Sequence, residues 1–219
     1  MTVDNPTEKA VKSVAVIVAH PDDETLWVGG TILYHSQWDW FVVSVCRAGD
    51  KDRAPKFFKV LQALGADGAM GDLDDGPEQT PLPEETVEQA ILKLLPAKHY
   101  DLIITHHPSG EYTRHLRHEE VSRAVISLWH AHQITTDELW VFAYEDGEQA
   151  YYPEAIDNAT IYHVLEKDIW QQKYTLMTNT YGFKEDSWEA QTTPASESFW
   201  CFDDPEEAYK WLNNKGITL

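Results

Sequence analysis

The sequence contains few cysteines and few basic residues. Its 219 residues include only two cysteines, Cys46 and Cys201, which lie far apart and form no disulfide framework pattern. Lysine and arginine total 17 against 37 aspartates and glutamates, which gives a formal net charge of -20. This shortage of positive charge argues against binding to nucleic acid backbones or anionic membranes through a broad basic patch.

Long apolar runs and a dinucleotide fingerprint are also missing. No segment reaches the roughly 20 apolar residues of a membrane helix, and residues 1–12 lack the apolar core of a signal peptide. The pair Gly29-Gly30 does not complete a G-x-G-x-x-G motif, so neither NAD nor FAD is expected. We therefore expect a cytoplasmic protein with no transmembrane segment and no nucleic acid partner. The sequence is compatible with a monomer or a homo-oligomer.

Strand and helix patterns alternate from residue 14 to about residue 144. Apolar runs predict four buried strands, and apolar residues spaced three and four apart predict helices between them. This alternation predicts an α/β fold with a Rossmann-like, doubly wound, mostly parallel sheet and helices on both faces. The predicted strands are Val14–Val18, Trp40–Cys46, Tyr100–Thr105 and Leu139–Tyr144, and the predicted helices are Thr25–Leu33, Arg53–Leu64, Glu84–Leu95 and His118–His132.

The domain prediction is a single domain over residues 1–219, with a core at 13–145 and a C-terminal extension at 146–219. In the core, residues 70–83 are rich in Asp, Gly and Pro and are expected to form a loop. The extension is expected to hold a strand at 159–165 and helices at 167–178 and 206–212. Residues 179–203 are aromatic and acidic and have no clear period.

A histidine and three carboxylates follow the first predicted strand directly, in the stretch His20-Pro21-Asp22-Asp23-Glu24. Ligands of open α/β sheets bind at the carboxyl ends of the strands. A histidine and carboxylates at this spacing can hold a divalent metal and leave one carboxylate free as a base. The simpler alternative is an acidic turn whose aspartate caps the next helix.

A second polar cluster follows the third predicted strand and opens a helix. It contains His115 and His118, whose spacing of three places them on one helix face. His20, Asp23 and one of these two histidines would give the three protein ligands of a catalytic zinc. Asp22 would then take a proton from water, and the remaining histidine, if protonated, would stabilise an oxyanion or protonate a leaving amine. The simpler alternative for the pair is a solvated start of a helix.

Other polar and aromatic residues are expected to have structural roles. His106 and His107, which follow a predicted strand, are expected to be structural or surface histidines. Asp74 and Asp75 are expected to be turn residues on the rim of the sheet, within reach of a substrate. Trp188 is expected in the core or an interface, with a sugar pocket as the alternative.

Together, the two clusters resemble the LmbE-like family of zinc-dependent deacetylases. The resemblance rests on His20-Pro21-Asp22-Asp23-Glu24 after the first strand, and on Gly110-Glu111-Tyr112 with His115-x-x-His118 after a later strand. It covers roughly residues 13–145. Members include N-acetylglucosaminyl-phosphatidylinositol de-N-acetylases and bacterial thiol-biosynthesis deacetylases, so the resemblance implies hydrolysis of an N-acyl amino sugar or conjugate.

The resemblance also implies a role for each matching residue. It implies that zinc is held by His20, Asp23 and His118. It implies that Asp22 is the general base and that His115 stabilises the tetrahedral intermediate. Two more positions match residues near the substrate: Arg53 matches a substrate-contacting arginine, and Tyr112 resembles a mobile tyrosine near the oxyanion.

Two parts of the sequence depart from the family pattern. Lys56 stands where members often carry an acidic residue close to the substrate. Leu116 and Arg117 stand where members have Pro-Asp between the two histidines. An aspartate there would orient a metal ligand, and an arginine cannot play that part. Glu119 or Glu120 is the expected substitute.

The first functional hypothesis is a hydrolase, dependent on zinc or another divalent metal, that removes an acetyl or other acyl group from a small amino sugar, its glycoside or its conjugate. The second hypothesis keeps the metal and changes the substrate to an amide in a thiol conjugate or another non-sugar amide. The third is a metal-binding or sugar-binding module without turnover. An intact base beside three metal ligands argues against this third hypothesis.

Overall fold

A seven-stranded sheet forms the centre of the protein. The computed structural model describes residues 11–112 and 114–214, so both ends of the predicted single domain lie outside the described residues. The strand order is β3-β2-β1-β4-β5-β9-β8; the first five strands are parallel, and β9 and β8 are antiparallel to their neighbours. The strands are β1 (Ser13–Val18), β2 (Asp39–Cys46), β3 (Asp67–Leu73), β4 (His99–Thr105), β5 (Thr135–Phe142), β8 (Ile161–Val164) and β9 (Ser196–Phe202).

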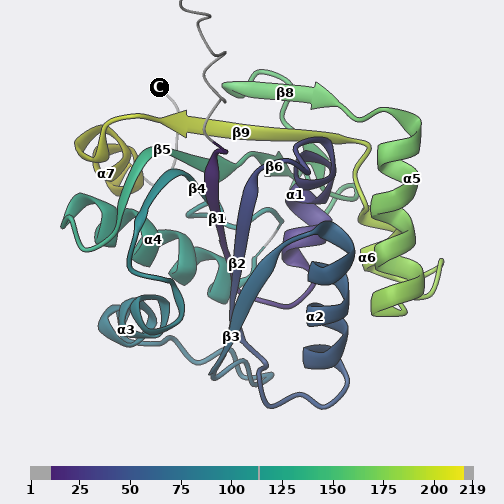
Figure 1. The fold of residues 1–219 in the computed structure, drawn as a ribbon, viewed down its shortest axis with the longest axis horizontal. Helices are drawn as coiled ribbons and strands as arrows, with labels where there is room; N and C mark the ends of the chain where they lie inside the picture. Colours follow the sequence, from purple (N-terminus) through teal and green to yellow (C-terminus); the bar gives the residue numbers. More distant parts are fainter. Residues whose placement is uncertain (1–10, 113, 215–219) are drawn as a thin grey trace, which may run out of the picture.

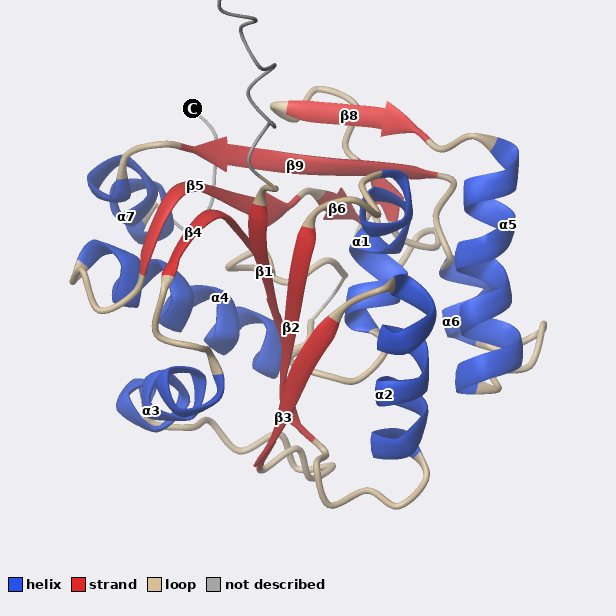
Figure 2. Ribbon diagram, viewed as in Figure 1, coloured by secondary structure: helices blue, strands red, loops and turns tan. Residues whose placement is uncertain are grey.

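Helices cover both faces of this sheet (Figure 1). One face carries α1 (Asp23–Tyr34) and α2 (Arg53–Leu64), with α5 (Lys167–Thr175), a π-helical turn (Leu176–Tyr181) and α6 (Trp188–Thr192) outside them. The other face carries α3 (Glu84–Leu94), α4 (Leu116–His130) and α7 (Pro205–Asn213) (Figure 2). A two-stranded ribbon, β6 (Tyr144–Glu145) with β7 (Glu154–Ala155), forms a second sheet that lies beside β9.

Two hydrophobic cores follow from the alternation of side chains along the strands. In β1, Ala15 and Ile17 pack with residues of α3, α4 and α7. Their neighbours Val14, Val16 and Val18 pack with residues of α1 and α2 on the opposite face. A strand buried on both faces needs apolar residues at every position, which explains its unbroken apolar run. The predicted α/β, doubly wound, mostly parallel fold is therefore confirmed.

One strand lies where the sequence predicted only a loop. Residues 70–73 belong to β3, which pairs with β2 at the edge of the sheet. The strand escaped prediction because its sequence, Asp67–Leu73, contains two glycines and two aspartates, which have low strand propensity. The glycines serve close packing: a Cβ on Gly68 would lie 2.4 Å from the carbonyl oxygen of Val42, and one on Gly71 would lie 2.7 Å from that of Val45.

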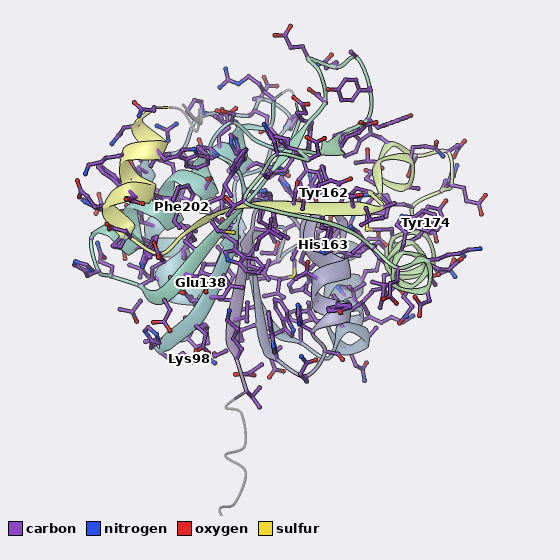
Figure 3. The ribbon with its side chains drawn as sticks, turned by 90° about the horizontal axis from the view of Figure 1, so that it is seen from above. Lys98, Glu138, Tyr162, His163, Tyr174 and Phe202 are labelled. Carbon is purple, nitrogen blue, oxygen red and sulfur yellow. The ribbon has the colours of Figure 1, made fainter. Side chains whose placement is uncertain are left out.

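A strand and a short helix lie within residues 179–203, where the sequence shows no clear hydrophobic period and predicted neither element. The strand β9 contains Glu197 and Ser198, both fully buried, so it lacks the expected alternation of apolar and polar residues. Viewed from above, β9 extends from the end marked by Phe202 past Tyr162 and His163 of β8 (Figure 3). Most predicted helices were confirmed within a few residues, and no helix of the described chain is long and apolar enough to cross a membrane.

A buried ion pair lies within the C-terminal extension, and its carboxylate also binds the backbone of α1. Lys173 and Glu197 are both fully buried, and Lys173 Nζ lies 2.7 Å from Glu197 Oε1. The same carboxylate accepts hydrogen bonds from the backbone N–H groups of Gly30 and Thr31, at 2.8 and 2.7 Å. Every charge in this cluster has a partner, so removal of one charge leaves the other buried and uncompensated.

We predict that Lys173→Met lowers the free energy of unfolding by about 3–5 kcal/mol, because Glu197 then stays buried without its cation. Urea unfolding followed by circular dichroism measures the change. Lys167→Met, on an exposed residue of the same helix, is the matched control. A loss below about 1 kcal/mol for Lys173→Met would show that the pair is not structurally important.

Candidate metal and catalytic site

The parallel pairing of β1 with β4 brings the two polar clusters together. In this ladder Val14 pairs with Leu102 and Ile17 with Thr105, so both strands end at the same edge of the sheet. The turn after β1 carries His20, and the segment after β4 leads into α4, which carries His118. Across 98 sequence positions, His20 Nδ1 lies 3.2 Å from His118 Nε2.

Three of the predicted ligand atoms form a compact triangle. Asp23 Oδ2 lies 3.2 Å from His20 Nδ1 and 3.4 Å from His118 Nε2, and the two imidazole atoms are 3.2 Å apart. Atoms about 2.0–2.1 Å from a tetrahedral zinc lie about 3.3 Å from one another, so this donor set fits the ion. Two imidazole nitrogens this close need a proton or a cation between them, which also favours a metal.

Each histidine of the triangle offers its second ring nitrogen to a buried carboxylate. His20 Nε2 lies 3.2 Å from Asp75 Oδ1, and His118 Nδ1 lies 2.5 Å from Glu111 Oε2. When each carboxylate accepts a hydrogen bond from the ring N–H, the opposite nitrogen of the ring is left free for a metal. Sequence reasoning assigned no such role to Asp75 or Glu111, although the loop of Asp75 was expected on this rim.

Glu111 takes the part that was expected of Glu119 or Glu120, and that expectation is wrong. Glu119 pairs with Arg114, and Glu120 pairs with Arg117, so neither carboxylate reaches a histidine of the site. Glu111 is fully buried, and its Oε1 accepts the backbone N–H of His107 at 2.8 Å.

His106 is buried beside the site and stacks on His118, with ring centroids 3.9 Å apart. Its Nδ1 lies 3.0 Å from Glu111 Oε2, and its Nε2 accepts the backbone N–H of Ala19 at 2.9 Å. His106, Asp23 and His118 also form a possible metal-binding group by distance alone. Because the lone pair of His106 Nε2 is already engaged by Ala19, His106 is better suited to orienting His118 than to binding a metal.

The predicted catalytic histidine, His115, lies against His20 and His118, the two predicted histidine ligands. Its ring centroid is 4.5 Å from those of His20 and His118, and its Nδ1 has no hydrogen-bond partner among the described residues. Burial and the neighbouring His118 and His20 lower the pKa of His115 to about 3. The imidazole is therefore neutral at pH 7, and it can still donate one N–H hydrogen bond.

Asp22 stands at the start of α1 but does not cap it. Its side chain makes no capping hydrogen bond, and its φ of 140° is a strained value for a residue with a side chain. The buried Glu24 stabilises this turn, since its Oε2 accepts the Asp22 N–H at 3.0 Å while Oε1 accepts the hydroxyl of Tyr181 at 2.7 Å. This arrangement differs from a simple acidic helix cap.

Arg53 contacts the predicted base. Its Nη1 lies 2.6 Å from Asp22 Oδ2, and its guanidinium lies 4.4 Å from the ring centroid of Phe183. Burial and repulsion from Asp23 raise the pKa of Asp22 to about 8, while the charge of Arg53 opposes this rise. Lys56 does not line the pocket and pairs instead with Asp52 at 2.7 Å.

A pocket of about 170 Å³ opens beside these residues. Tyr112 forms part of its wall, and the ring of Tyr112 lies 4.7 Å from that of Trp188, centroid to centroid. Trp188 and Glu189 come from α6, so the C-terminal extension completes the wall of a pocket formed mainly by the core. The pocket is lined by His20, Pro21, Asp22, Asp23, Leu26, Arg47, Arg53, Tyr112, His115, Trp188 and Glu189.

Comparison with known proteins defines the family. Residues 15–129, more than half of the chain, match the family described as PIG-L, GlcNAc-PI de-N-acetylase. The chain belongs to this family, the LmbE-like metal-dependent deacetylases. No curated protein matches the chain significantly.

Several solved structures share the fold at low sequence identity. The 4-carboxy-2-hydroxymuconate hydratase GalB from Pseudomonas putida is 17% identical, with a TM-score of 0.57 over 83% of each chain. The conserved protein TT1542 from Thermus thermophilus is 16% identical, with a TM-score of 0.58 over 87% of this chain and 94% of that one. The A40926 pseudoaglycone deacetylase Dbv21 is 15% identical, with a TM-score of 0.55 over 88% and 98%.

We predict that zinc binds more tightly as the pH rises from about 6 to 7.5. Burial alone would lower the pKa values of His20 and His118, but contacts with Asp23 raise both above the usual value. Protons therefore occupy these rings at low pH and compete with the metal. Calorimetric titrations in two buffers of different ionisation enthalpy measure the affinity and the protons released.

His130→Gln removes a histidine outside the site and is expected to leave this pH dependence unchanged. A zinc affinity that stays constant over the same pH range, with no proton release, would contradict the proposed donor set.

Proposed function

We propose that the protein is a zinc-dependent hydrolase that removes an acetyl or other acyl group from an amino sugar, its glycoside or its conjugate. The observation that carries this proposal is the triangle of His20, Asp23 and His118 with a separate carboxylate, Asp22, beside it. Membership of a de-N-acetylase family supports the reaction class. When bound, zinc would lower the pKa of water and polarise the amide carbonyl.

Asp22 is suited to moving the proton. Its carboxylate faces the pocket and holds the Arg53 guanidinium at 2.6 Å. A buried carboxylate with a raised pKa can accept a proton from water and later return it to the amine that leaves. A bound dication lowers that pKa again, which brings the group closer to neutral pH. Asp22, rather than the neutral His115, is therefore the proton donor to the leaving amine.

His115 is suited to binding the oxygen of the acyl group as it gains negative charge. The ring is neutral and lines the pocket beside His20, so one N–H can donate to this oxygen. Tyr112 and Trp188 form the apolar wall of the same pocket and exclude water from the opposite side.

The space next to the pocket favours a substrate larger than a single sugar. A groove of about 480 Å³ shares Tyr112 and Trp188 with the pocket of about 170 Å³. Its far wall contains Tyr151 and Tyr152, which are 43% and 48% exposed. Aromatic rings beside the reacting group suit the flat face of a second ring, so a glycoside or conjugate fits better than the free amino sugar.

We predict that Asp22→Asn binds zinc as tightly as the natural protein and loses turnover by roughly 10²-fold or more, because the amide cannot accept a proton. Metal analysis and an amine-release assay measure the two properties separately. Asp52→Asn, at an exposed residue that pairs with Lys56 and does not line the pocket, is the control that keeps activity. Normal turnover in Asp22→Asn would remove this residue from the mechanism.

A substrate screen with zinc-loaded protein distinguishes the functional hypotheses. It compares N-acetylglucosamine, its disaccharide glycosides, an N-acylated thiol conjugate and a simple non-sugar amide. We expect release of acetate from the sugars, with a lower KM for the glycosides than for the free sugar. Turnover confined to the thiol conjugate or the simple amide would support the second hypothesis, and no turnover of any amide would support a binding module.

A further inference from the structure

Asp75 carries a buried carboxylate in a loop that is acidic and mostly exposed. The loop connects β3 with α3, and the side chain of Asp74 in it is 63% exposed. The side chain of Asp75 is only 6% exposed and turns toward the strand ends. Burial of a carboxylate is costly unless its oxygens are paired, so its partners reveal its role.

The two oxygens of Asp75 contact different parts of the site. Oδ1 lies 3.2 Å from Nε2 of His20 and also accepts the amide of Gln79 at 3.0 Å. Oδ2 accepts two hydrogen bonds from Arg47, from Nε at 2.8 Å and from Nη2 at 2.5 Å. Arg47 lines the pocket, so one carboxylate connects a proposed metal ligand with a side chain that faces the substrate.

Arg117 holds the loop that carries Asp75. Its fully buried guanidinium donates from Nε to the carbonyl oxygen of Asp74 at 2.5 Å and from Nη2 to that of Thr80 at 2.8 Å. Its Nη1 pairs with Glu120, whose other oxygen accepts the backbone N–H of Leu82 at 2.8 Å. The loop is thus fixed to α4 at both of its ends.

The helix α4 therefore contributes to both histidine ligands. It carries His118 directly, and through Arg117 it sets the position of the loop whose Asp75 contacts His20. This arrangement explains why an arginine stands at position 117. Arg117 is next to His118 in sequence, but it acts on His20, through the loop that carries Asp75.

We propose that Asp75 is a positioning residue that fixes the ring of His20 for zinc and the guanidinium of Arg47 for substrate, and that Arg117 places it. The inference rests on the metal site of the proposed function. A carboxylate on the outer nitrogen of a ligating histidine fixes its tautomer, directs the opposite nitrogen to the metal and raises its basicity. The same carboxylate holds the guanidinium of Arg47 through two hydrogen bonds, and the φ of 66° at Arg47 is a strained value for a residue with a side chain.

An asparagine at position 75 provides a sharp test. Its side chain has the size of aspartate, but only one of its two polar ends accepts a hydrogen bond. It can satisfy His20 or Arg47, and not both. We expect Asp75→Asn to weaken zinc binding by about 10- to 100-fold, measured by competition with a chromophoric chelator. Glu78→Gln, at an exposed residue of the same loop, is the matched control and keeps the natural affinity.

Two further variants separate positioning from general stability. Arg117→Met is expected to weaken zinc binding in the same direction and to speed hydrogen exchange of amides in residues 74–82, while exchange in the strands stays slow. Arg47→Met is expected to keep zinc affinity and to raise KM with little change in kcat. Thermal unfolding of each metal-free variant checks that the fold is retained.

Zinc affinity equal to that of the natural protein in Asp75→Asn would overturn the proposal, whatever the substrate. Loss of zinc from Glu78→Gln to the same extent would also overturn it, because the effect would then belong to the charge of the loop. Zinc affinity and hydrogen exchange are measured without substrate. They therefore test this inference even if no deacetylation is found. Turnover together with unchanged zinc affinity in Asp75→Asn would leave the proposed function intact and reject this inference.

Discussion

The meeting of two imidazoles at the ends of β1 and β4 is the contact on which the site depends. His20 Nδ1 and His118 Nε2 lie 3.2 Å apart, and both point at Asp23 Oδ2. Two neutral nitrogen lone pairs repel at this distance, so the arrangement requires a proton or a cation between them. The parallel pairing of the two strands brings the segments that carry these residues to the same edge of the sheet.

The surrounding protein holds each proposed ligand from a different segment. Asp75 reaches His20 from the loop after β3, and Glu111 reaches His118 from the segment after β4. The indole N–H of Trp27, in α1, donates to Asp23 Oδ1 at 3.2 Å. A site supported from separate elements is preorganised, because no ligand can rotate without breaking a buried hydrogen bond. The strained backbone of Asp22 is likewise held in place by a neighbouring residue, because Glu24 accepts its N–H.

Most of the fold could be predicted from the sequence because its strands are buried on both faces. Val14–Val18 has no polar break, and the structure places it at the centre of the sheet. The missed strands have local reasons: β3 contains glycines required by close backbone contacts, and β9 contains the buried Glu197. In both strands, tertiary contacts outweighed the local propensity.

The candidate site was predictable only where its residues share a short motif. His20, Asp22 and Asp23 are neighbours in sequence, and the spacing of His115 and His118 suggests one helix face. Glu111 lies in the motif Gly110-Glu111-Tyr112, and Asp75 lies in a loop of turn residues. Neither pattern shows that the carboxylate contacts a histidine, because that contact depends on how the loops fold against α4. Arg117 is the clearest example. Its departure from the family pattern is explained by its hydrogen bonds to the loop carbonyls of Asp74 and Thr80, which the sequence does not reveal.

X-ray absorption spectroscopy of the zinc-loaded protein tests the central claim most directly. The account predicts one zinc per chain with two imidazole nitrogens and oxygen donors, at zinc–nitrogen distances of about 2.0–2.1 Å. A spectrum with sulfur donors, or with no imidazole at the metal, would contradict the account.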